Sequence, residues 1–131
     1  MHEQDKAILQ TLVSVAWADG HFAERERQLI EALLESFGAD TTESDELRAY
    51  ASTPRSFDDI PITELSYADR RAALQHAVVL SWVDGAQHED ELAMLERLRD
   101  KLHIPAEEAT PLIDAANARA KELLALLSEP S

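Results

Sequence analysis

The chain repeats itself at a spacing of 65 residues, and this repeat limits the folds that it can adopt. Trp17-Ala18-Asp19-Gly20 returns as Trp82-Val83-Asp84-Gly85, and each turn is followed by a glutamate, Glu26 or Glu91. The apolar residues around the turns pair at the same spacing: Leu9 with Leu74, Val13 with Val78, Ile30 with Leu95 and Leu33 with Leu98. Two copies of one helix-turn-helix unit explain the pattern, because each copy can bury its apolar face against the other.

The apolar residues recur at helical spacing, which predicts an all-α, single-domain bundle of about six to seven helices built from two pseudo-symmetric repeats. We expect repeat halves over about 4–38 and 67–104, an ordered connecting arm over 39–66, and a closing helix over about 105–127. Thr42 is expected to cap a short helix in the arm, and Ser66 with Asp69 to start the helix that follows it. Pro105 and Pro111 each suit a first helical turn, which predicts a short turn over 105–109 and a separate helix from Pro111.

Composition excludes several classes of function. The chain carries 26 acidic against 12 basic residues, a formal charge of −14, so most of its surface would repel nucleic acid. It has no cysteine, which removes disulfides and thiolate sites. No segment has the roughly 18 consecutive apolar residues of a membrane helix, so we expect a soluble, cytoplasmic protein without direct membrane insertion.

Each turn reads Asp-Gly, five residues, Glu, which is the spacing of the second half of an EF-hand calcium loop. The first half is missing. The positions of its first two side-chain ligands hold Val15 and Trp17 in one copy, and Leu80 and Trp82 in the other. These side chains offer no oxygen, so a standard EF-hand is excluded.

Two explanations of the acidic residues remain. Glu26 and Glu91 fall near the third position of a helix, where a carboxylate accepts backbone N–H bonds and interacts favourably with the helix dipole. Capping does not require Asp19 and Asp84, which lie near a helix C-terminus, where negative charge is mildly unfavourable. The second hypothesis brings Asp19, Glu26, Asp84 and Glu91 into one patch that binds a divalent cation, for which oxygen ligands favour Ca²⁺, Mg²⁺ or Mn²⁺.

Other residue types give weaker signals. Trp17 and Trp82 are interpreted as core anchors. The histidine spacings match no zinc motif, so we expect exposed loop histidines at His21 and His88 and no special role for His2, His76 and His103.

The two turns also resemble those of a known family. Ala16-Trp17-Ala18-Asp19-Gly20 through Glu26 and Ile30, with the echo at Asp84-Gly85 through Glu91 and Leu95, is similar to the TerB-like domain of tellurite-resistance proteins and of some membrane-anchored DnaJ-type co-chaperones. The resemblance implies a pseudo-two-fold helical bundle, a metal-binding acidic patch and a role in bacterial stress response. Ala23 and His88 depart from the family, which often has a small hydroxyl residue there.

The function predicted from these features is a non-enzymatic TerB-like adaptor of a stress-response or membrane-associated protein complex, with a divalent cation as its only cofactor. No glycine-rich phosphate loop or nucleophile turn is present. A metal-dependent hydrolase that uses the same acidic cluster, or a stand-alone cation buffer, is the alternative. The sequence gives no prediction of the oligomeric state.

Overall fold

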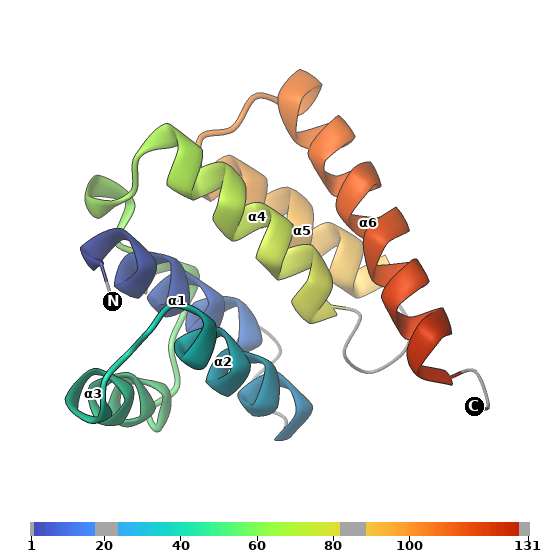
Figure 1. The fold of residues 1–131 in the computed structure, drawn as a ribbon. Helices are drawn as coiled ribbons and strands as arrows, with labels where there is room; N and C mark the ends of the chain where they lie inside the picture. Colours follow the sequence, from blue (N-terminus) through green and yellow to red (C-terminus); the bar gives the residue numbers. More distant parts are fainter. Residues whose placement is uncertain (1, 18–23, 82–88, 129–131) are drawn as a thin grey trace.

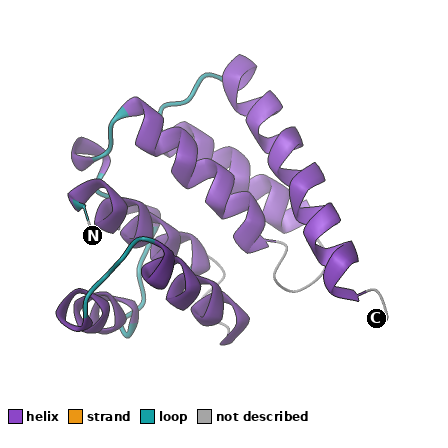
Figure 2. Cartoon of the chain, viewed as in Figure 1, coloured by secondary structure: helices purple, strands orange, loops and turns teal. Residues whose placement is uncertain are grey.

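The computed structural model describes residues 2–17, 24–81 and 89–128, and all of their side chains except 25, 81, 89–92 and 123–128. This part of the chain is all-α, as predicted, with six α-helices and two short 3₁₀ turns (Figure 2). None of its helices is long and apolar enough to cross a membrane. The elements are α1 (Glu3–Ala16), α2 (Glu24–Ser36), α3 (Thr41–Ala51), η1 (Phe57–Asp59), η2 (Ile62–Glu64), α4 (Tyr67–Ser81), α5 (Glu89–Lys101) and α6 (Ala106–Ser128).

The helix boundaries reproduce the 65-residue repeat. α2 and α5 correspond at both ends, α1 and α4 end at equivalent residues, and α3 and α6 begin at equivalent residues, Thr41 and Ala106. The correspondence therefore extends past the first two helices of each half to the start of a third. α3 stops after 11 residues, whereas α6 continues for 23.

The core lies between the first helices of the two halves. α1 packs along α4, α1 also contacts α2 and α3, and α4 also contacts α5 and α6 (Figure 1). Every residue of α1 from Ala7 to Ala16 except Gln10 is buried, which is typical of a helix covered on several sides. The fully enclosed large apolar side chains come from both halves: Leu9, Leu12, Val13, Leu74, Val78, Leu95, Leu98 and Leu102.

The last turns of α2 and α5 share one backbone motif. Gly38 has φ +74°, its N–H donates to the Glu35 carbonyl, and the Ala39 N–H donates to the Leu34 carbonyl. The equivalent residues do the same: His103 has φ 56° and donates to Asp100, and Ile104 donates to Arg99. This is the Schellman arrangement, which satisfies carbonyls at a helix end through a left-handed residue.

The helix starts confirm one predicted cap and correct another. The Ser66 N–H donates to Asp69 and the Asp69 N–H to the Ser66 hydroxyl, both at 3.1 Å, as predicted. The prediction that Thr42 caps α3 is wrong. Asp40 has the extended backbone of an N-cap and exchanges hydrogen bonds of 2.8 and 3.0 Å with Glu43. A carboxylate at this position accepts the N–H that the first helical turn leaves unpaired.

The predicted break at Pro111 is also wrong, because Pro111 lies inside α6. The helix begins just after Pro105, whose carbonyl accepts from Glu108 and Ala109. A proline in the second turn removes one helical hydrogen bond. Ala109 and Ala116 are nevertheless buried seven residues apart, and α6 packs along α4. Tertiary packing on both sides of the proline therefore stabilises a continuous helix.

The segment over 52–66, which connects α3 to α4 and is called the arm below, packs against both halves. η1 and η2 contact α1, and Ile60 and Leu65 are buried. Lys101 of α5 pairs with Asp58 at 3.8 Å, and the Arg97 guanidinium lies 5.7 Å from the Phe57 ring centre. The arm thus joins α1 to α5 across the two repeats.

Candidate functional site

The helices that flank the two repeated turns end on the same side of the bundle. α1 ends at Ala16 and α4 at Ser81, both toward the lower right of Figure 1, where α2 and α5 begin. The predicted ligands Asp19 and Asp84 lie outside the described residues. The packing of α1 along α4 agrees with the arrangement that the cation hypothesis requires, and the gathering of the four carboxylates stays a prediction.

The two predicted glutamates occupy equivalent positions. Glu26 is the third residue of α2, in its first turn, and its side chain is half-buried. Glu91 is the third residue of α5, and its side chain lies outside the described set. A carboxylate in a first turn is stabilised by unpaired N–H groups and by the helix dipole. This position suits a helix cap and a cation ligand alike.

The starts of α2 and α5 differ in charge. Arg25 and Arg27 alternate with the acids of α2, and Arg27 pairs with Glu24 at 3.8 Å. α5 opens with Glu89-Asp90-Glu91 and has no base before Arg97. Within the described part of the chain, no three histidine, aspartate or glutamate side chains are placed to hold a metal ion. The predicted metal ligands include residues outside that part and remain a prediction.

Trp17 connects the first turn to α3. Its side chain is half-buried and packs against the core, and its Nε1–H donates to the Ala51 carbonyl at 3.0 Å. Ala51 is the last residue of α3, so its carbonyl has no partner within that helix. The predicted role of a core anchor therefore holds for Trp17, with a specific bond in addition. Trp82 lies outside the described residues.

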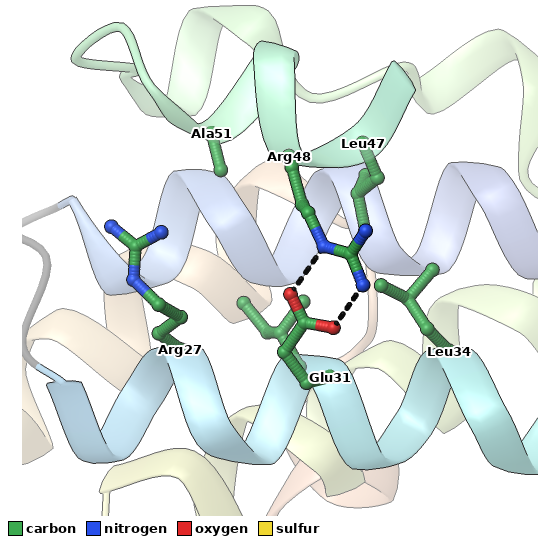
Figure 3. Close-up of a pocket in the computed structure, with 7 residues that line it drawn as sticks. Arg27, Glu31, Leu34, Leu47, Arg48 and Ala51 are labelled. Atoms are coloured by element: carbon green, nitrogen blue, oxygen red, sulfur yellow. Dashed lines mark hydrogen bonds and ion pairs between the residues drawn. The ribbon is translucent and has the colours of Figure 1, made fainter. Parts of the chain in front are cut away.

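Arg48 joins α3 to α2 through a two-pronged ion pair (Figure 3). Its Nε and Nη2 atoms donate to the two Glu31 carboxylate oxygens at 2.7 and 2.8 Å, and Nη1 donates to Asp45 at 3.0 Å. The Arg48 hydrogen bonds hold the pKa of Glu31 below its usual value, against a smaller opposing effect of burial. The cavity beside the pair is about 10 Å³, close to the minimum for one water. We interpret this pair as a structural clamp.

Two histidines have particular environments that the sequence did not indicate. His76 of α4 is half-buried with its ring edge-on to Phe37, and burial lowers its pKa. His103 takes the left-handed conformation that glycine takes in the first repeat. Alignment of the repeats could have found His103, because Gly38 is its equivalent.

An open groove lies between α4 and α6. Its volume is about 310 Å³, and six residues line it: Gln75, His76, Val79, Ala115, Ala116 and Arg119. Sequence reasoning missed this groove because the lining residues form no motif. Alignment of the repeats could have indicated the groove, because Ala115 of α6 is equivalent to the much larger Tyr50 of α3.

A comparison with known protein families identifies the family of this chain. The model of a family described as "Protein of unknown function (DUF533)" matches residues 1–116. The chain belongs to this family. DUF533 is a TerB-like family, which agrees with the resemblance seen at the turns at the level of the broader group. The DUF533 match includes both repeated turns and extends into α6. No curated protein and no solved structure matched the chain.

Proposed function

We propose that this DUF533 protein is a non-enzymatic, TerB-like adaptor of a stress-response assembly of the tellurite-resistance type. In this proposal a divalent cation binds between the two Asp-Gly turns through Asp19, Glu26, Asp84 and Glu91. One observation carries it: α1 packs along α4 so that the acidic starts of α2 and α5 lie on the same side of the bundle (Figure 1).

The physical argument concerns repulsion. Four carboxylates drawn together in a chain of charge −14 repel one another unless a cation neutralises them. Carboxylate oxygens select hard cations, so Ca²⁺, Mg²⁺ and Mn²⁺ are the candidates. A bound cation would fix the two turns relative to each other and present an ordered acidic face to a protein partner.

Calorimetry and thermal unfolding test the cation site. Metal-free protein is titrated with CaCl₂, MgCl₂ and MnCl₂, and melting is compared with EDTA present. An ion at about 100 times its Kd is expected to stabilise the fold by about 2.7 kcal/mol. Asp19→Asn with Asp84→Asn is expected to abolish the heat and the shift. The matched control, Glu64→Gln with Asp114→Asn, removes two exposed acids elsewhere and should retain both.

Identical melting with metal and with EDTA would refute the cation site. The adaptor role is tested by co-purification: a protein partner that binds in Ca²⁺ or Mn²⁺ should be released by EDTA and by the Asp19→Asn, Asp84→Asn variant. Metal-dependent hydrolysis in a broad substrate screen would instead support the enzyme alternative.

A further inference from the structure

In the first repeat, an aromatic side chain of the third helix packs against the core close to the first helix. Tyr50 of α3 packs against the core beside the buried Ser14 hydroxyl of α1. The Arg55 guanidinium lies over the Tyr50 ring, 3.8 Å from its centre. The phenol points to the backbone of the arm, with its oxygen 3.5 Å from the Asp59 carbonyl. Tyr50 therefore has an apolar wall, a cation over its ring and a polar contact for its hydroxyl.

The equivalent positions of the second repeat carry no aromatic ring. Ala115 stands where Tyr50 is, Ala116 where Ala51 is, and Val79 where Ser14 is. These three residues line the α4–α6 groove. The groove measures about 310 Å³, whereas an apolar cavity of roughly 150 Å³ is enough to bind benzene. The equivalent of Tyr50 thus has no ring, and the groove that it lines is large enough to hold one.

The chemistry of the groove also suits an aromatic group. Val79, Ala115 and Ala116 give an apolar floor, while Gln75 and His76 can hydrogen-bond a hydroxyl. Arg119 is exposed and makes no ion pair within the described residues, so its guanidinium is available to an aromatic face. None of the six lining residues is acidic, although the chain carries a charge of −14.

We propose that the α4–α6 groove binds an aromatic side chain, of tyrosine type, presented by a protein partner. The ring would lie on Val79 and Ala115 with Arg119 over it, as Arg55 lies over Tyr50. The groove is open to the surface, which leaves room for the backbone that carries the side chain. This inference rests on the adaptor role proposed above and names how the partner is anchored.

A titration followed by ¹H–¹⁵N NMR tests the groove with defined probes. The probes are p-cresol, which is the tyrosine side chain alone, and N-acetyl-tyrosine N-methylamide, which adds the flanking peptide groups. Both are expected to shift the amides of residues 75–79 and 115–119 saturably, with a Kd on the order of millimolar for so few atoms. 4-Methylcyclohexanol, which has a similar size but no aromatic ring, should bind more weakly.

Ala115→Tyr is the decisive variant, because it supplies the ring that Tyr50 supplies in the first repeat. It should abolish the binding of both probes. Ala118→Tyr adds the same side chain to an exposed position of α6 that does not line the groove, and should leave binding unchanged. Arg119→Ala should weaken binding by about two- to fivefold through the loss of a cation–π contact.

Several results would overturn the proposal. These are no saturable shift at the groove, equal binding to the Ala115→Tyr variant, or equal binding of 4-methylcyclohexanol. Binding of p-cresol without the blocked tyrosine would indicate a site for free phenols and exclude a partner side chain. The groove shares no residue with the two turns, so Ala115→Tyr should still bind Ca²⁺ or Mn²⁺. Failure of the groove and failure of the cation site are therefore separate results.

Discussion

The two repeats use one pattern of helices and differ in how the third helix is attached. In the first repeat, Asp40 caps α3 and its own N–H donates to the Glu43 carboxylate, while Arg48 clamps α3 to α2. In the second, Pro105 replaces Asp40 and has no N–H to offer. Glu108, the equivalent of Glu43, instead accepts a hydrogen bond from the Tyr67 hydroxyl, and α6 packs along α4. The two repeats share the spacing of their core residues and the positions at which their first two helices end. The surface contacts differ, and Ala115, the equivalent of Tyr50, lines an open groove.

The largest effects are expected where the repeats agree. Leu9 of α1 and Leu74 of α4 are equivalent, and neither side chain is exposed. Leu9→Ala and Leu74→Ala should each lower the free energy of unfolding by about 2–5 kcal/mol, because each leaves a cavity in a packed core. Urea unfolding measures both. Similar losses would show that the two halves contribute equally to one core, whereas a large loss from one variant alone would show that the other half packs loosely.

Two equivalent leucines of the third helices should give smaller and unequal losses of stability when each is replaced by alanine. Leu47 of α3 is 4% exposed, whereas its equivalent in α6, Leu112, is half-buried and is not part of the core. Leu47→Ala should cost about 2–5 kcal/mol, and Leu112→Ala only about 1 kcal/mol, in proportion to the apolar surface removed from water. Urea unfolding under one set of conditions compares them. Equal costs would mean that α6 buries Leu112 as α3 buries Leu47.

Substitutions at the left-handed residues that end α2 and α5 should change the free energy of unfolding in opposite directions. At Gly38 an added Cβ meets nothing within 4 Å, so the left-handed backbone alone should make Gly38→Ala cost about 1 kcal/mol. His103→Gly removes the strain of the left-handed backbone, but it also raises the conformational entropy of the unfolded chain. The net effect should be a stabilisation of roughly 0.5 kcal/mol or less. Thermal and urea unfolding report both changes.

The His103 end has additional support: Arg70 Nη1 donates to the Leu102 carbonyl at 3.0 Å. Arg70→Ala serves as the control in the same assay. If it costs more stability than His103→Gly gains, the hydrogen bond explains how a residue other than glycine is tolerated there. A loss of stability from His103→Gly would contradict the assigned strain.

The sequence predicted the helices and most of their ends because those depend on local rules. Apolar spacing predicted α1, α2, α4 and α5, and Gly38 predicted the end of α2. It failed at Pro111, where packing of α6 on α4 outweighs a local helix breaker.

The candidate site was harder to predict than the fold. The repeated acids are visible in the sequence, but their positions relative to one another in space depend on how the two repeats pack, which no local pattern encodes. The α4–α6 groove is lined by an alanine at the position where the first repeat has a tyrosine. A small residue such as alanine forms no recognisable motif. Ala115 indicates a groove only when the two repeats are aligned and it is compared with Tyr50.

The smallest expected effect is a difference in pH dependence at one core-facing position. His76 is equivalent to Thr11, whose hydroxyl is buried and donates to the Ala7 carbonyl at 2.8 Å. Burial lowers the pKa of His76 from 6.5, so the unfolded chain takes up the proton more readily than the folded one. Stability from this group is therefore complete above the unfolded pKa and is lost as pH falls through the folded pKa.

His76→Thr places the first-repeat residue in the second repeat and removes that titration. The free energy of unfolding of both proteins is measured in urea at pH 8, 7, 6 and 5. The difference between them should change little between pH 8 and pH 7, because His76 is mostly neutral in both states there and its edge contact with Phe37 contributes equally. Below about pH 6.5 the wild type should lose more stability than the variant, because its unfolded state gains a proton that the folded state resists. Parallel profiles over the whole range would mean that His76 is solvated enough to protonate in place, and the two repeats would then be electrostatically alike at this position.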